Sequence, residues 1–189
     1  FRRVLFRSYL NTYSYVLTKM MYENLRKQSD NRASVLTRSA FAGQQRFGTS
    51  IWSGDIYASW DVLKKQLVAG LNICMTGIPY WTTDIGGFRV RSRENSGEGT
   101  GEIGTEIHRN ISSCDGGYAK GLKDSAYLEL YTRWFQYGAL SPIFRAHGTE
   151  VPREIWHFGE PGSLFYDIQV EMIHLRYSLL SYIRSEEHT

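Results

Sequence analysis

The sequence predicts an α/β fold in which helices cover a parallel β-sheet, on three observations. Short apolar segments alternate with segments of helical periodicity, the connections between them are short, and most of the short segments are apolar at consecutive positions. Strands of a parallel sheet are buried on both faces and therefore read as continuous apolar runs. A (β/α)8 TIM barrel and an open doubly wound sheet both fit this pattern.

The first part of the chain supplies two helices and two strands. Apolar residues at helical spacing predict a helix over 12–28, and segments 33–41 and 48–56 predict two short buried strands with their exit loops. Residues 59–72 predict a second helix with Ser59 as its N-cap, because a serine hydroxyl can accept a hydrogen bond from a free amide of the first turn. The predicted inner face of this helix consists of Val62, Leu63, Leu67, Val68 and Leu71.

The remaining elements continue the alternation. A third buried strand is predicted over 72–81, which would place Cys74 in the core as a small apolar residue. A Gly-x-Gly-x-x-Gly match at 99–104 follows no buried strand, so we expect a flexible insertion there rather than a dinucleotide site. The last predicted elements are a helix over 125–138, a fourth strand over 141–148 and a final helix over 165–183.

Polar and aromatic side chains follow each predicted strand. They are Arg38 after the first, Trp52 and Asp55 after the second, Trp81 and Asp84 after the third, and Arg145 and His147 after the fourth. In a barrel all carboxyl-terminal strand ends converge on one cleft, whereas in an open sheet only those at the switch point do. Four consecutive strand ends of this kind favour the barrel.

Asp55 is the first candidate for acid–base chemistry. It follows Gly54, which lets the backbone turn sharply, and it lies close to Trp52 in the sequence. A carboxyl group beside an indole and away from bulk water has a raised pKa, which suits a general acid that must keep its proton. The ordinary alternative is that Asp55 caps the next helix.

Asp84, followed by Gly86 and Gly87, is a second candidate, but free carboxylates also bind sugar hydroxyls, and Arg38 and Arg145 could do likewise. Each has an ordinary alternative role. Asp84 could cap a helix, Arg38 could form a structural ion pair, and His147 could be a satisfied loop residue.

The two ends of the chain read differently from the rest. One short DNA stretch translates as residues 184–189 (RSEEHT), and its reverse complement translates as residues 3–8 (RVLFRS). We therefore expect 1–8 and 184–189 to be sequencing-adapter DNA read through as protein. On this interpretation residues 9–183 are a partial domain of a longer protein.

The composition bears on the class of function. Four of the 22 basic and two of the 19 acidic residues lie in the two end segments, so the net charge of +3 becomes +1 for 9–183, which gives no basic footprint for nucleic acid. No apolar run reaches the ~18 residues that a membrane span needs. Histidines and cysteines show no metal spacing, so we expect no metal and no cofactor. Aromatic residues make up 14% of the chain, which fits both an aromatic core and a sugar-binding cleft.

Four longer motifs combine the candidate residues: LTRSAFAGQQRFGTSIWSGDI, W-x-x-L-x-x-Q-x-x-AGLN, GIPYWTTDIGGF and RWFQYGALSPIFRAHG. In this order and spacing they resemble glycoside hydrolase family 31, and AHGTEVPREIWHFGEPG is most similar to its bacterial α-xylosidases. The resemblance implies the C-terminal half of a (β/α)8 barrel, strands five to eight. It also implies a retaining, exo-acting hydrolase of α-linked sugars, with an oligosaccharide as substrate.

The resemblance also implies roles for individual residues. Asp55 of WSGD matches the family's general acid/base, and Arg38 of LTRS resembles the arginine that binds substrate hydroxyls beside the nucleophile. The positions that line the subsite of the cleaved sugar are Trp52, Asp84 and Phe88, together with Arg145 and His147 of the R-x-H motif.

No residue of the chain matches the family's nucleophile, an aspartate at the end of the fourth strand. Asp30 lies in a polar turn and Asp61 opens a helix. Retaining hydrolysis needs two carboxyl groups about 5–5.5 Å apart, so we expect the chain alone to be inactive. The alternatives are an α-glucosidase, an α-glucan lyase or transglycosylase of the same family, and a non-catalytic sugar-binding relative. The compartment stays open between periplasm and cytoplasm if the source is bacterial.

Overall fold

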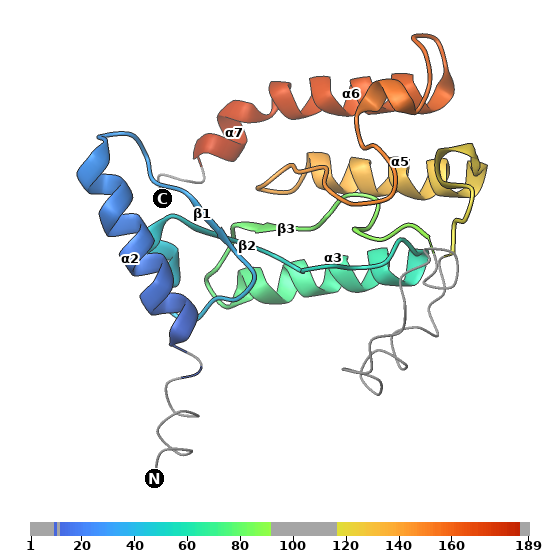
Figure 1. Cartoon of the computed structure of the whole chain (residues 1–189). Coiled ribbons are helices and arrows are strands. Elements are labelled where there is room, and N and C mark those ends of the chain that lie inside the picture. Colours follow the sequence, from blue (N-terminus) through green and yellow to red (C-terminus); the bar gives the residue numbers. More distant parts are fainter. Residues whose placement is uncertain (1–9, 11, 92–116, 186–189) are drawn as a thin grey trace.

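The computed structural model describes residues 10, 12–91 and 117–185, so the glycine motif at 99–104 lies outside the described residues. Strands and helices are mixed as far as Thr82, and only helices and short 3-10 turns follow it in the described residues (Figure 1). The elements are α2 (Tyr13–Gln28), β1 (Val35–Thr37), β2 (Thr49–Trp52), α3 (Trp60–Met75), β3 (Trp81–Thr82), α5 (Ser125–Ala139), α6 (Leu164–Ser178) and α7 (Leu180–Ser185). Short 3-10 turns lie at Gln44–Phe47, Gly121–Lys123 and Ile155–His157.

The three strands form one parallel sheet in the order β1-β2-β3, which confirms the predicted parallel pairing. Val35 pairs with Thr49, and Ile51 pairs with both Thr37 and Trp81. In Figure 1 β3 lies between α3 and α5, β1 lies beside α2, and α6 packs on the outer side of α5. Because the strands are parallel, their carboxyl ends all lie at the same end of the sheet.

Helix α3 begins where the sequence predicts but buries a different face. The Ser59 hydroxyl accepts a hydrogen bond from the Val62 amide at 3.2 Å, which confirms the N-cap. Val62 and Leu63 are buried, as predicted, together with Gln66 and Gly70. The prediction was wrong for Leu67, Val68 and Leu71, which are exposed. A Cβ on Gly70 would lie 3.0 Å from the Trp81 ring, so the helix approaches the sheet through its smallest residue and turns the leucines outward.

Two predicted strands are not formed as expected. Residues 72–75 belong to α3, which leaves β3 only two residues long and places Cys74 on the surface. Residues 141–148 contain no strand. Arg176 of α6 donates hydrogen bonds to the carbonyl groups of Ala139, Ser141 and Pro142, so a side chain takes acceptors at the start of this segment. The final predicted helix is divided at Leu179 into α6 and α7.

An aromatic core joins α5 to the sheet and to α6. Tyr127, Tyr131 and Trp134 are fully buried, and Tyr131 stacks on Phe158 with ring centroids 4.0 Å apart. The indole nitrogen of Trp134 donates to the Thr83 hydroxyl at 2.7 Å and so fixes α5 to the end of β3. Part of the aromatic content therefore stabilises the core.

Candidate active site

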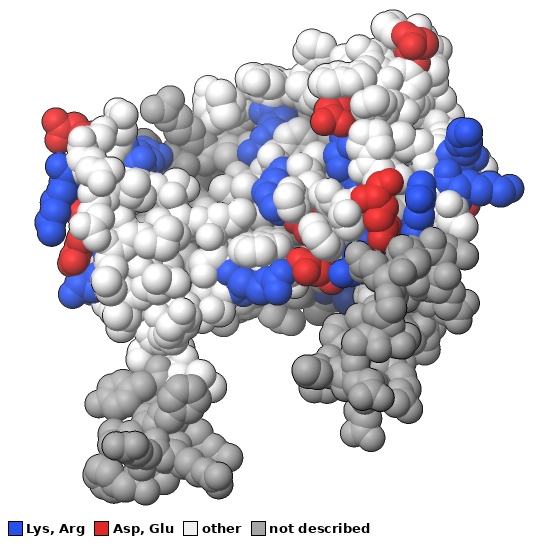
Figure 2. All heavy atoms as spheres, viewed as in Figure 1, with Lys and Arg blue, Asp and Glu red and all other residues white. Residues whose placement is uncertain are grey.

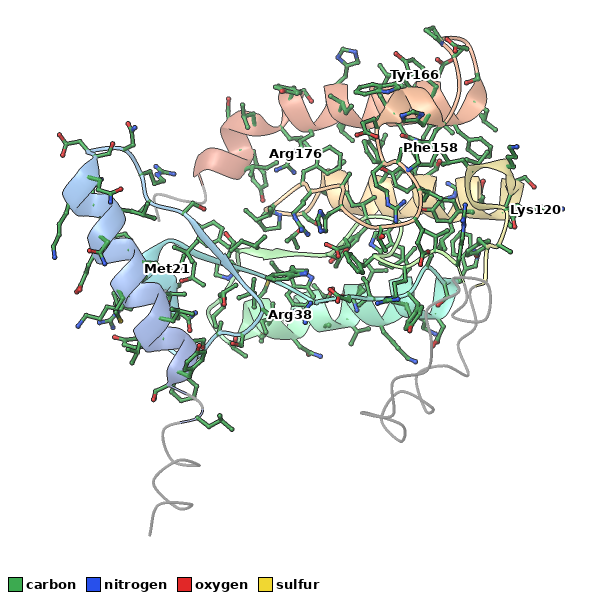
Figure 3. All side chains as sticks on the ribbon, viewed as in Figure 1. Met21, Arg38, Lys120, Phe158, Tyr166 and Arg176 are labelled. Atoms are coloured by element: carbon green, nitrogen blue, oxygen red, sulfur yellow. The ribbon has the colours of Figure 1, made fainter. Side chains whose placement is uncertain are left out.

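Arg38 and Asp55 meet at the carboxyl end of the sheet. Arg38 follows β1 (Figure 3) and its Nη2 lies 2.6 Å from Asp55 Oδ1, beyond the end of β2. Gly54 has a φ of 83°, a left-handed conformation that glycine adopts without strain. This turn directs Asp55 toward β1. Since Ser59 is the N-cap of α3, Asp55 does not have the capping role that was its ordinary alternative.

The surroundings of Asp55 differ from the expectation in one respect. Its side chain is 43% exposed, so the predicted shielding from bulk water is absent in this structure. The ring of Trp52 instead contacts two guanidinium groups, with Arg38 Cζ 5.4 Å and Arg145 Cζ 5.8 Å from its centroid. Trp52 therefore links the end of β1 to the segment that follows α5.

Asp84 is the buried carboxyl group of the site. Its side chain is fully buried, and Oδ1 accepts a short hydrogen bond from Arg145 Nη1. Burial raises the pKa of Asp84, and the positive charge of Arg145 opposes that rise. The Oδ2 atom has no hydrogen-bond partner among the described residues, so one acceptor of this carboxyl group remains unused.

Phe88 and His147 are the last two of the predicted site residues. Their rings stack with centroids 5.7 Å apart and an interplanar angle of 29°. His147 also acts electrostatically on Asp84. Direct contacts thus connect five of the predicted residues, from Asp55 through Arg38, Trp52 and Arg145 to Asp84. Phe88 and His147 contact each other, and Phe88 lies four residues after Asp84 in the same loop.

Sequence reasoning missed two charged residues beside this site, Glu150 and Arg153. Arg153 is 7% exposed and donates hydrogen bonds to the backbone of the loop that carries Phe88. Charged residues are seldom buried, so a sequence places them in solvent by default. Their place in the sequence, between His147 and the aromatic segment 155–158, was the one feature that could have indicated that they lie beside the site.

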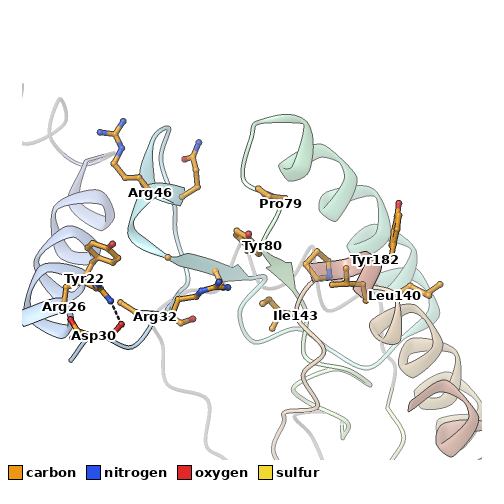
Figure 4. A pocket seen from close by; sticks show the side chains of 17 residues that line it. Tyr22, Arg26, Asp30, Arg32, Arg46, Pro79, Tyr80, Leu140, Ile143 and Tyr182 are labelled. Atoms are coloured by element: carbon orange, nitrogen blue, oxygen red, sulfur yellow. Dashed lines mark hydrogen bonds between the residues drawn. The ribbon is translucent and has the colours of Figure 1, made fainter. Parts of the chain in front are cut away.

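A cavity in the described part of the chain lies away from the site residues. It has a volume of about 730 Å³ and is lined by residues that precede the strands, among them Ser34, Gly48 and Tyr80 (Figure 4). None of the seven site residues lines it. In (β/α)8 enzymes the chemistry takes place at the carboxyl ends of the strands, so the candidate site is the end of the sheet that carries Asp55 and Asp84.

The surface charge, the helix lengths and the placement of possible ligand side chains can be compared with what nucleic acids, membranes and metal ions require. On the face shown in Figure 2, acidic and basic side chains are interspersed. No helix in the described part of the chain is long and apolar enough to span a bilayer. Within the same residues, no group of three or more His, Cys, Asp or Glu side chains is placed to hold a metal ion.

Comparison with known proteins gives a consistent picture. Residues 3–186 match the model described as the glycosyl hydrolases family 31 TIM-barrel domain. The chain is 40% identical over 177 residues to an α-xylosidase of Saccharolobus solfataricus, covering 94% of this chain and 20% of that protein. It is 34% identical over 176 residues to a probable glucan 1,3-alpha-glucosidase of rice (Oryza sativa), covering 91% and 15%.

A solved structure of a family 31 α-xylosidase from Xanthomonas citri superposes with a TM-score of 0.75 at 37% identity, covering 94% of this chain and 17% of that chain. The chain therefore spans about a fifth of the length of the relatives it matches.

Proposed function

Because the chain belongs to glycoside hydrolase family 31, we propose that it is part of a longer enzyme's catalytic barrel, with β1, β2 and β3 as strands five to seven and segment 141–148 at the position of strand eight. We propose further that this enzyme is a retaining, exo-acting α-xylosidase. The observation that carries the proposal is the Arg38–Asp55 pair at the carboxyl edge of the sheet, joined through Trp52 to the buried Asp84–Arg145 pair. The names of the relatives in Saccharolobus and Xanthomonas favour the xyloside.

In this proposal Asp55 is the general acid/base. Its partly exposed carboxyl group can reach a glycosidic oxygen, and the contact with Arg38 fixes its orientation for protonating that oxygen and later activating water. The nucleophilic carboxylate of the complete enzyme would lie beside Arg38.

The other five residues hold the sugar. The unused Oδ2 of Asp84 and the guanidinium group of Arg145 are suited to adjacent sugar hydroxyls, because the two groups are already fixed against each other. The Phe88–His147 stack offers a flat apolar surface to the C–H face of a pyranose, and Trp52 holds the guanidinium groups of Arg38 and Arg145 in place beside the sugar.

An α-glucosidase is the second candidate. The rice relative is named as a probable glucan 1,3-alpha-glucosidase, and glucose differs from xylose only in the C6 hydroxymethyl group. The same carboxyl groups serve both substrates, so the two candidates differ in the fit of that group.

The proposed preference for xylosides predicts how the complete enzyme, obtained by extending the gene on both sides, discriminates between xylosides and glucosides. A pocket built for a pentose rejects the hydroxymethyl group through overlap or stranded polar groups. We expect kcat/KM for an aryl α-xyloside to exceed that for the matching α-glucoside by about 100-fold or more. Equal values, or a preference for the glucoside, would transfer the assignment to α-glucosidase.

A further inference from the structure

The loop after β3, residues 84–91, is held from two sides. On one side the Arg89 amide donates to the Ile56 carbonyl at 3.0 Å and the Arg89 carbonyl accepts from the Ala58 amide at 2.8 Å. On the other side the Thr149 amide donates to the Phe88 carbonyl at 2.9 Å. This loop carries Asp84 and Phe88, so its position sets two of the sugar-binding side chains.

Glu150 adds a second contact on the Thr149 side. Its Oε2 accepts hydrogen bonds from the amides of Val90 at 2.8 Å and Arg91 at 2.7 Å. Glu150 has a φ of 74° and is the one non-glycine residue with positive φ in the described part of the chain. Such a conformation is disfavoured and persists where surrounding interactions determine it, often beside functional sites.

Arg153 contacts the other end of the same loop. Its Nη2 donates to the Gly87 carbonyl at 2.8 Å and its Nη1 to the Val151 carbonyl at 2.7 Å. No carboxylate of the described residues forms a salt bridge with it, so this buried guanidinium group is used for directed hydrogen bonds to backbone. A Cβ on Gly148 would lie 2.7 Å from Arg153 Cζ, so the glycine after His147 leaves the space that the guanidinium group occupies.

We propose that Glu150 and Arg153 are positioning residues for the stacked rings of Phe88 and His147, the apolar surface proposed to bind the sugar. Glu150 holds the amides at Val90 and Arg91, and Arg153 holds the carbonyl at Gly87, so Phe88, which lies between these contacts, stays stacked on His147. The catalytic consequence of this inference rests on the proposed function. The link between loop 84–91 and the segment that carries Glu150 and Arg153 does not depend on that function.

The test uses variants of the complete enzyme with an aryl α-xyloside as substrate. Displacing binding groups by about 1 Å can cost about 100-fold, so Arg153→Met and Gly148→Ala should lower kcat/KM by roughly that factor. Arg153→Lys, which keeps a charged donor group but loses the planar fork, should lose less. Arg133→Met removes an exposed arginine that pairs with Glu129 on α5 and is the matched control, with kcat/KM expected to change by less than about 2-fold.

Substitutions at Glu150 separate the carboxylate from the backbone conformation. Glu150→Gly relieves the positive φ but has no acceptor, so it should lose as much kcat/KM as Glu150→Ala. Glu150→Gln keeps one oxygen that can accept from both amides and should retain most of it. If Glu150→Gly were as active as wild type, the carboxylate would have no positioning role.

Amide hydrogen exchange gives a readout that needs no substrate. In Arg153→Met and Glu150→Gly, residues 84–91 should exchange faster while α5 stays protected. Unchanged exchange at 84–91, or an equal rise in α5, would overturn the proposal, since the residues would then do nothing locally or stabilise the whole domain. A wild-type enzyme that cleaves no α-glycoside would overturn the proposed function, and the exchange pattern would still decide whether the loops are linked.

Discussion

Replacing Asp55 with alanine in the complete enzyme should lower kcat for an oligosaccharide substrate by about 10³-fold or more, while cleavage of an activated aryl glycoside proceeds almost unaided. A sugar leaving group departs as an alkoxide unless it is protonated, whereas an activated phenol is already a weak base, so the two substrates need the acid to different extents. Pre-steady-state kinetics with both substrates measures the difference.

Asp61→Ala provides the control for this substitution. Asp61 lies on the exposed first turn of α3, paired with Lys65 at 2.6 Å, and we expect its removal to affect both substrates little. A parallel loss with both substrates in Asp55→Ala, matched by a loss of thermal stability, would show that Asp55 is only structural.

The chain on its own should hydrolyse no glycoside and should associate. It lacks a match to the nucleophile, and β1 and β3 each have one neighbour in the described sheet, which leaves strand edges open to other chains. Large apolar side chains are also exposed along α2, including Tyr13, Val16 and Met20. Size-exclusion chromatography and an assay with an aryl α-xyloside test both expectations.

A monomer that melts cooperatively and turns over the xyloside would contradict this expectation. Such a result would mean that the second carboxyl group lies within the chain and that the open edges are harmless. Coexpression with the upstream part of the barrel is the matching positive control.

The sequence was sufficient to predict the features that depend on local pattern. Apolar runs gave the parallel pairing of β1, β2 and β3, and a serine before an amphipathic run gave the N-cap of α3. The convergence of Arg38, Asp55 and Asp84 follows from parallel strands whose ends carry polar residues. This part of the site needed no knowledge of tertiary contacts.

The remaining features depend on contacts between residues far apart in the sequence. Gly70 lets α3 approach Trp81 closely, which decides the buried face of the helix. Arg176 takes the carbonyl groups at the start of segment 141–148. Burial of Asp84 and exposure of Asp55 depend on which side chains cover each carboxyl group, and no local pattern encodes that.

The configuration of the azide product from Asp55→Ala tests the central assignment most directly. With an activated aryl α-xyloside the variant should accumulate the covalent intermediate, because the residue that activates water is missing. Azide needs no general base, so it should restore turnover and yield the α-xylosyl azide, the configuration that two inversions produce. Absence of rescue would contradict the acid/base role of Asp55, and a β-azide would mean that azide displaced the leaving group directly, without a covalent intermediate.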